Sequence, residues 1–270
     1  MPELTSAWSE GWLWLGGSLL LAVLWTNLAW LLRRPRSGPV GEFVTRLVAW
    51  RFSPSLLQSF RLLYYLGLPF AALSWGRDAV VSRLLGLQVI KLPVSAAKAT
   101  GAYVAANWLD WATDGGWAAA VGIGTWGLLV LGWWFYRRAV VATDDRDATS
   151  GAGTGWVFLR ESAYHEVHWA FYRNAPILTV GAYWGIWIGL GLVAVEAALN
   201  PAWRRDLAHP QRTPGLLVRA ALAVVSSVLF WLTENLWLAL ALHWGVSWGL
   251  VVLARALPLV PDRTPDQASA

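Results

Sequence analysis

Residues 228–248 read VLFWLTENLWLALALHWGVSW. Two apolar runs meet in this stretch, and only Glu234 and Asn235 separate them. The runs extend over about 215–233 and 236–256, and each is close to the roughly 20 apolar residues that cross a bilayer as an α-helix. A two-residue connection is too short for any arrangement other than a helical hairpin. The stretch therefore predicts an antiparallel pair of transmembrane helices.

The whole chain has the composition of a multi-pass membrane protein. Of its 270 residues, 57% are hydrophobic and 14% are charged. Soluble domains average roughly 45–50% apolar and about 25% charged residues, so the composition argues against a soluble fold. The 22 tryptophans agree with this, because indole rings favour the membrane interface. The absence of cysteine excludes disulfides, thiolate metal ligands and a cysteine nucleophile.

Arginine-rich and glycine-rich segments separate the other apolar runs. Segment 77–114 is expected to be a loop with an interfacial helix, or a weakly hydrophobic packed helix. Residues 143–155 have the composition of a linker. If the helix at 156–173 also crosses the membrane, the sequence predicts an all-α transmembrane bundle of about seven spans. They lie at 11–32, 56–75, 117–135, 156–173, 177–199, 215–233 and 236–256.

The net charge of +5 comes mostly from arginines between the apolar runs. Those in the loops 33–55, 137–155 and 201–214 would share one side of the membrane, which the positive-inside rule makes cytoplasmic. No basic stripe with interleaved aromatic residues occurs on a polar segment, so we expect no nucleic-acid partner. The sequence predicts a multi-pass protein of the cell membrane, with the lipid bilayer as its main partner.

Residues 161–176 read ESAYHEVHWAFYRNAP and concentrate ionisable groups in this apolar chain. Each residue of an α-helix advances by about 100°, so positions i, i+4, i+7 and i+11 form one stripe. Four side chains of the segment occupy that stripe: Glu161, His165, His168 and Tyr172. Glu166 and Arg173 lie on an adjoining face.

Ionisable groups at membrane depth are costly, so they usually face a protein interior or a water-filled cavity and pair there. The stripe therefore predicts an inward-facing polar site, and its carboxylate and imidazole groups suit a Zn²⁺ ion. The pattern also fits a helix that begins at the membrane interface. In that interpretation Glu161 is in water and the histidines bond their neighbours.

Two further ionisable residues lie in apolar runs. His243 is near the middle of 236–256, with Ser247 one turn later to orient it, and Glu196 is near the end of 177–199. A hydrogen bond from the imidazole to a backbone carbonyl, or a carboxylate that ends a helix at the interface, would explain the same residues. Because separate burial of two unpaired imidazoles is costly, we expect His168 and His243 to approach within about 8 Å of each other.

The stretch 228–248 resembles the last conserved block of the CAAX-protease and bacteriocin-processing (CPBP, or Abi) family of intramembrane metalloproteases. Three features carry the resemblance: the tripeptide 235–237 (NLW), His243, and Ser247 where the family has Asn or Asp. The family's EExxxR block falls on residues 168–173, which read HWAFYR, and its FxxxH block falls on 192–196, which read LVAVE. The resemblance covers residues 156–256.

The resemblance implies an all-α bundle around a polar chamber and a metal-dependent endopeptidase that acts on a peptide or membrane protein. It implies a zinc ion, with a glutamate that takes a proton from the metal-bound water. The expected metal ligands are His165, His168, Glu196 and His243. Glu166 or Glu161 would be the base, and Arg173 would partner Glu166 or anchor the helix at the interface.

Residues 168–173 and 192–196 differ from the family's EExxxR and FxxxH motifs, and several alternatives follow. Weak or absent activity is expected, and the same fold would then serve as a non-catalytic scaffold or binding subunit with a partner in a membrane complex. A third interpretation makes the histidines axial ligands of a porphyrin or chlorin among the tryptophans. We divide the chain into an N-terminal transmembrane region (1–150), a CPBP-like region (151–258) and a polar tail (259–270).

Overall fold

The computed structural model describes residues 2–32, 34, 38–75, 86, 101–142, 154–209 and 212–256. These residues form α-helices and one π-helix, and the described part contains no strand, so the predicted all-α fold is confirmed. The elements are α1 (Pro2–Leu32), α2 (Pro39–Ala49), α3 (Ser53–Leu62), η1 (Leu63–Gly67), α4 (Leu68–Trp75), α5 (Gly101–Ala142), α6 (Gly155–Val180), α7 (Ala182–Leu199), α8 (Pro201–Leu207), α9 (Thr213–Thr233) and α10 (Leu236–Ala256).

Five described segments are long and apolar enough to cross a membrane, and each overlaps a predicted span. They are Glu10–Leu32, Trp108–Tyr136, Ala182–Leu199, Thr213–Thr233 and Leu236–Ala256. The predicted spans 56–75 and 156–173 are helical but are not among the five. The first is divided among α3, η1 and α4, and the second lies in α6, whose ionisable residues lower its hydropathy. The fold is that of a membrane protein, whereas the count of seven spans is not confirmed.

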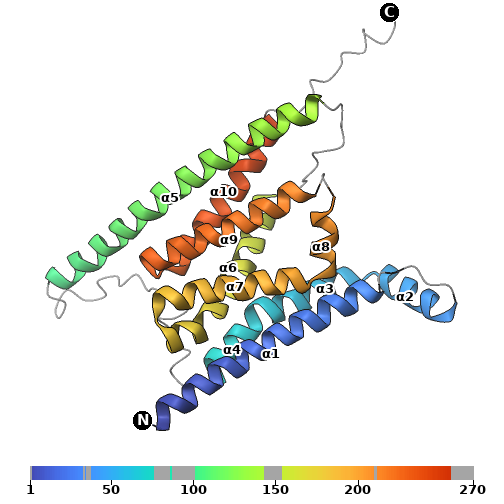
Figure 1. The fold of residues 1–270 in the computed structure, drawn as a ribbon, viewed down its shortest axis with the longest axis horizontal. Coiled ribbons are helices and arrows are strands. Elements are labelled where there is room, and N and C mark those ends of the chain that lie inside the picture. Colours follow the sequence, from blue (N-terminus) through green and yellow to red (C-terminus); the bar gives the residue numbers. More distant parts are fainter. Residues whose placement is uncertain are drawn as a thin grey trace, which may run out of the picture.

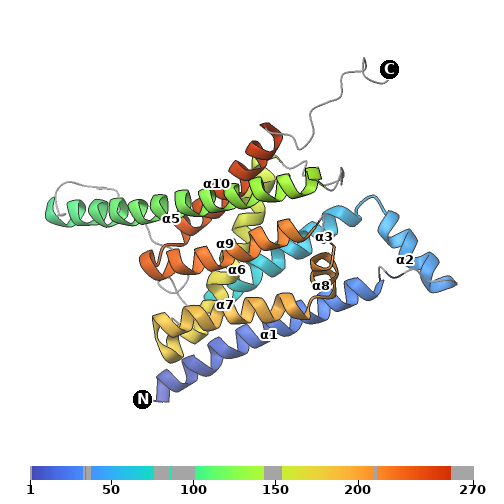
Figure 2. The same ribbon diagram turned by 45° about the horizontal axis from the view of Figure 1, so that its top comes forward.

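Helix α6 runs through the middle of the bundle (Figure 2). It packs against α7, α10, α1, η1 and α4. Its residues 168–176 are all buried, although they include a histidine, an arginine and an asparagine. The most polar of the long helices is therefore covered by apolar ones over this stretch, and Glu166, His168 and Arg173 face protein.

A close hairpin joins α6 to α7. Helix α6 continues through Pro176 to Val180, and the chain reverses at Gly181, whose φ of 85° is readily adopted only by glycine. A Cβ atom on Gly185 would lie 2.4 Å from Cα of Ile177, and one on Gly189 would lie 2.7 Å from Cγ of Arg173. Two glycines four residues apart thus let the two backbones approach closely, as at many membrane helix interfaces.

The helix boundary at Gly181 differs from the predicted spans. The sequence predicts one helix over 156–173 and the next over 177–199, with a break near Pro176. Proline lacks an N–H group and disfavours a helix interior, but neighbouring helices tolerate it in buried and membrane helices. The break lies at the glycine, where the backbone can turn.

The turn between α9 and α10 lies at Glu234 and Asn235, as the sequence predicts. Glu234 has a left-handed φ of 47°. Oδ1 of the buried Asn235 accepts hydrogen bonds from the backbone N–H groups of Trp237 and Leu238 at 3.1 and 3.4 Å, which caps α10. The carbonyl oxygen of Gly86 accepts the N–H of Leu236 at 2.8 Å, so a distant part of the chain also fixes this turn.

Helix α5 lies along one edge of the bundle against α9 and α10 (Figure 1). It contains 42 residues, and at about 1.5 Å per residue it is longer than a bilayer core. It begins at Gly101, within the segment 77–114 that is expected to be loop or packed helix. The rest of that segment, apart from Gly86, lies outside the described residues, as do residues 143–153 of the predicted linker and the tail from 257.

Candidate functional site

Two clusters of hydrogen-bonded polar side chains lie on different faces of α6. We call the first the Glu166 cluster; it lies between α6, α9 and α10 and contains Glu166, Arg173, Ser226, Ser227 and His243. We call the second the Glu196 cluster; it lies between α6, α7, η1 and α1 and contains Ser18, Tyr64, His168, Tyr172 and Glu196. Glu166 and His168 are two residues apart, so they point about 200° from each other.

Both carboxylate oxygens of Glu166 are held by protein donors. Nδ1 of His243 lies 2.8 Å from Oε1, and the Ser226 hydroxyl donates a short hydrogen bond to Oε2. Glu166 has no exposed surface. A buried carboxylate needs such donors, because an unpaired charge in the interior is very costly.

Arg173 supplies the positive charge of this cluster. Its Nη2 donates to the hydroxyls of Ser226 and Ser227, each at 3.3 Å, and its guanidinium lies 4.9 Å from the ring centroid of Phe230. Ser226 therefore bridges Arg173 and Glu166, so the two charges compensate each other through a hydroxyl. Nη1 of Arg173 is buried and has no hydrogen-bond acceptor in the part of the chain that the structure describes.

The imidazole of His243 is held between other rings. Trp169 stacks on it with ring centroids 5.3 Å apart, and His165 does so at 5.8 Å. Nδ1 of His165 lies 2.7 Å from the backbone oxygen of Glu161. The sequence predicts Ser247 as the residue that orients His243, but the structure gives this role to Glu166.

In the Glu196 cluster, Nε2 of His168 lies 2.9 Å from Oε2 of Glu196. The hydroxyl of Tyr64 lies 3.4 Å from that nitrogen and 3.4 Å from the hydroxyl of Tyr172. Nδ1 of His168 is buried without a partner among the described residues. The side chain of Glu196 is 18% exposed, so this cluster, unlike the other, reaches the surface of the bundle.

A π-helical turn places two tyrosines against α6. In η1 the turn widens at Leu63–Gly67, and both Tyr64 and Tyr65 meet His168, with ring centroids 5.1 and 5.2 Å apart. Tyr65 also stacks on Tyr164 at 5.5 Å. Single π-helical turns inside α-helices often mark functional positions. These two tyrosines are not among the predicted site residues, although their adjacent phenols stand out within the apolar run 56–75.

Glu161, the other candidate base, lies at the edge of the site. Its carboxylate forms an ion pair with both terminal nitrogens of Arg61, at 3.1 and 2.5 Å, and a third contact with Arg160 at 3.1 Å. The side chain is partly exposed. In the structure it therefore links α6 to α3 and is separate from the Glu166 cluster.

The four predicted metal ligands do not form one group. His168 and Glu196 are paired in one cluster, whereas His243 pairs with Glu166 in the other, and His165 stacks on His243 at 5.8 Å. Across the described residues, no three His, Asp or Glu side chains are placed to hold a metal ion together. Zinc sites use three or four protein ligands. The arrangement of these donors does not fit such a site. Zinc binding by this chain therefore remains an untested prediction.

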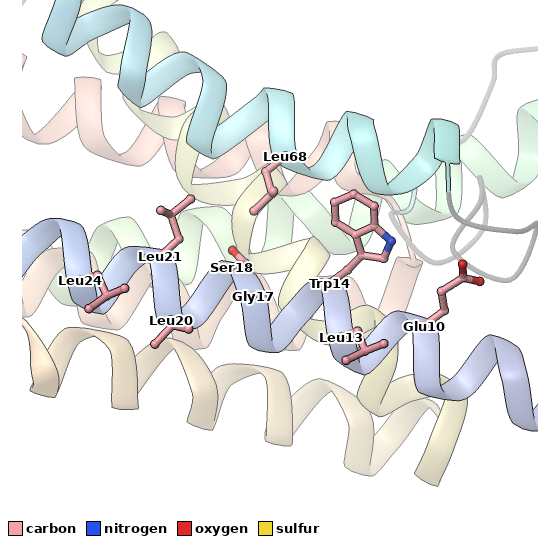
Figure 3. Close-up of a pocket in the computed structure, with 9 residues that line it drawn as sticks. All are labelled: Glu10, Leu13, Trp14, Gly17, Ser18, Leu20, Leu21, Leu24 and Leu68. Atoms are coloured by element: carbon pink, nitrogen blue, oxygen red, sulfur yellow. The ribbon is translucent and has the colours of Figure 1, made fainter.

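A shallow groove of about 530 Å³ lies between α1 and α4 (Figure 3). Leucines of α1, Trp14 and Leu68 form most of its lining, and Glu10 lies at one end. Ser18 also lines the groove, and its hydroxyl lies 3.5 Å from the hydroxyl of Tyr64. One serine and one tyrosine thus separate this apolar groove from the His168–Glu196 pair.

The comparisons with known proteins give no relative. No protein-family model, no curated protein and no solved structure matches the chain. The similarity of residues 156–256 to the CPBP family remains a resemblance of motifs.

Proposed function

We propose that this chain is a non-catalytic membrane protein that serves as a binding or scaffold subunit, on a bundle of the CPBP type. The observation that carries the proposal is the state of Glu166, whose two oxygens are both bonded to protein donors in a fully buried position. A general base needs an oxygen within hydrogen-bond reach of the water that it activates. Here the neighbouring serine and histidine occupy both oxygens.

The same network has a clear structural role. Glu166 and Arg173 of α6, Ser226 of α9 and His243 of α10 tie three helices together at one level of the bundle. Removal of one partner from a buried ion pair typically costs about 3–5 kcal/mol, because it leaves an uncompensated charge. These polar residues therefore fix how the three helices meet, which is what a scaffold requires.

A metal-dependent endopeptidase is the second candidate, and one observation favours it. Helices α6 and α10 carry the first and last motifs that resemble the family, and they bring Glu166 and His243 into direct contact. A carboxylate beside an imidazole is the pair that such chemistry needs. The arrangement differs from a metal site in that two other expected ligands, His168 and Glu196, pair with each other in the Glu196 cluster, away from His243.

Purified full-length protein in nanodiscs separates the two candidates. The measurements are zinc content, cleavage of membrane peptides with added Zn²⁺, and the midpoint of thermal unfolding. We expect no stoichiometric zinc and no cleavage, together with a large fall in the midpoint for Glu166→Gln. Glu42→Gln, which changes an exposed carboxylate, is the matched control and should behave as the parent protein.

The opposite result is equally clear. This result would be one bound zinc ion per chain and cleavage of the peptide that Glu166→Gln abolishes, with an unchanged unfolding midpoint. It would contradict the scaffold proposal and support the endopeptidase.

A further inference from the structure

Helix α2 (Pro39–Ala49) projects from the bundle beyond the end of α1 (Figures 1 and 2). Among the described elements it packs mainly against the neighbouring helix α3. Large apolar side chains on it are exposed among the residues that the structure describes: Phe43 and Val48 are each 66% exposed. Exposed apolar side chains are ordinary on a membrane-spanning helix. With 11 residues, however, α2 would be about 16 Å long, which is too short to cross a bilayer core.

The side chains of α2 divide into two faces. At about 100° per residue, four apolar side chains fall within an arc of about 140°. They are Phe43, Val44, Leu47 and Val48. Glu42, Thr45 and Arg46 lie on the remaining arc, and Glu42 pairs with Arg46 at 3.4 Å. A helix of this kind is stable where one side meets an apolar medium and the other side meets water.

The position of α2 supplies that boundary. The candidate span of α1 ends at Leu32, and α2 begins at Pro39, so the helix follows directly on the exit of the chain from the bilayer. Trp50 and Phe52, which come next, are also exposed aromatic residues. Aromatic side chains concentrate at the level of the lipid headgroups.

The charge of the segment identifies the lipid. Residues 33–51 contain five arginines and one glutamate, which gives a net charge of +4. Basic residues beside an amphipathic face attract anionic lipids, and each contributes about five-fold to binding at a charged surface. We infer that α2 is an interfacial helix that lies on the bilayer, with its apolar face among the acyl chains and with Arg46 and the flanking arginines on anionic headgroups.

The chain contains no cysteine, so single spin labels can be introduced into the full-length protein. Leu47→Cys places a label on the apolar face, and Thr45→Cys places one on the opposite face as the matched control. The proteins are reconstituted in nanodiscs of phosphatidylcholine, with or without phosphatidylglycerol. Accessibility to oxygen and to a water-soluble nickel complex then reports the depth of each label.

We expect the label at 47, but not the one at 45, to lie among acyl chains when phosphatidylglycerol is present. The double variant Arg46→Gln, Arg51→Gln should reduce this depth, and 0.5 M salt should do the same, because salt screens exposed charges. Arg138→Gln, in the last turns of α5, removes a positive charge elsewhere in the chain and should leave the depth unchanged. A label at 47 that remains accessible to the nickel complex in both lipid mixtures overturns the inference. So does a label immobilised by protein contact whatever the lipid.

Discussion

Ser226 and Ser227 are adjacent, and both accept a hydrogen bond from Arg173. Their own hydroxyl protons go to different places. Ser226 donates to the carboxylate of Glu166, whereas Ser227 donates to the backbone oxygen of Ala223 in its own helix. Of these two serines, Ser226 alone connects Glu166 with Arg173, although the sequence gives no reason to distinguish them.

Substitution of these serines should therefore have unequal effects. Ser226→Ala leaves one oxygen of a buried carboxylate without a donor, and we expect it to lower the free energy of unfolding by about 1–3 kcal/mol. Ser227→Ala should cost less, because Arg173 keeps its bond to Ser226. Thermal or denaturant unfolding in detergent measures both. Equal losses would contradict the bridging role of Ser226.

Asp206, outside the candidate spans, gives a prediction of pH dependence. Its hydrogen bond from Arg212, at 2.7 Å, lowers the pKa of the Asp206 carboxyl below its usual value. The pKa of Asp206 is therefore lower in the folded chain than in the unfolded chain, and the contact stabilises the folded chain at pH values above the unfolded-state pKa. As the pH falls through the folded-state pKa, Asp206 is protonated and this contribution is lost. The pair is exposed, so the effect on stability is small. A carboxyl titration by NMR should show the lowered pKa of Asp206. Arg212→Gln should reduce the shift, with Arg205 keeping part of it, while Arg138→Gln should leave it unchanged.

At the scale of helices, the sequence predicts most of the elements. Long apolar runs identify all five candidate spans, and the Glu234–Asn235 turn lies where predicted. The break at Gly181 is missed because Pro176 is a stronger local signal than a glycine in an apolar run. The π-helical turn at Leu63–Gly67 has no periodic signature, so the contacts of Tyr64 and Tyr65 could not be predicted.

The two clusters show the same limit. Helical periodicity places Glu166 and His168 on different faces, which the structure confirms. It cannot say which helix covers each face, because that choice depends on packing between segments 28 to 77 residues apart in the chain. The pairing of His168 with Glu196 and of Glu166 with His243 therefore required the structure.

The glycines of α7 give a test at this scale. A Cβ atom on Gly189 would overlap the backbone of α6, whereas one on Gly191 would meet nothing within 4 Å. We expect Gly189→Ala to destabilise the protein by about 1–3 kcal/mol through overpacking. Gly191→Ala should be neutral or slightly stabilising, because alanine favours the helix. Unfolding midpoints of the two variants decide between close packing and a loose interface.

The whole molecule makes a prediction about sidedness. Helix α9 is a candidate span with Arg204 near one end and Glu234 at the other. In the cysteine-free chain, Arg204→Cys and Glu234→Cys should therefore react with an impermeant maleimide from opposite sides of a sealed vesicle. Reaction of both from the same side would mean that α9 does not cross the membrane.

The buried polar helix α6 also constrains how the protein is made. Its partners for Glu166 lie 60 and 77 residues later in the chain, so the ribosome needs roughly 4–15 s to deliver the second of them. If α6 enters the membrane before then, each of its charged side chains costs about 2.5–3.5 kcal/mol in lipid. We therefore expect α6 to remain beside the insertion machinery until α9 and α10 are made and can enclose it.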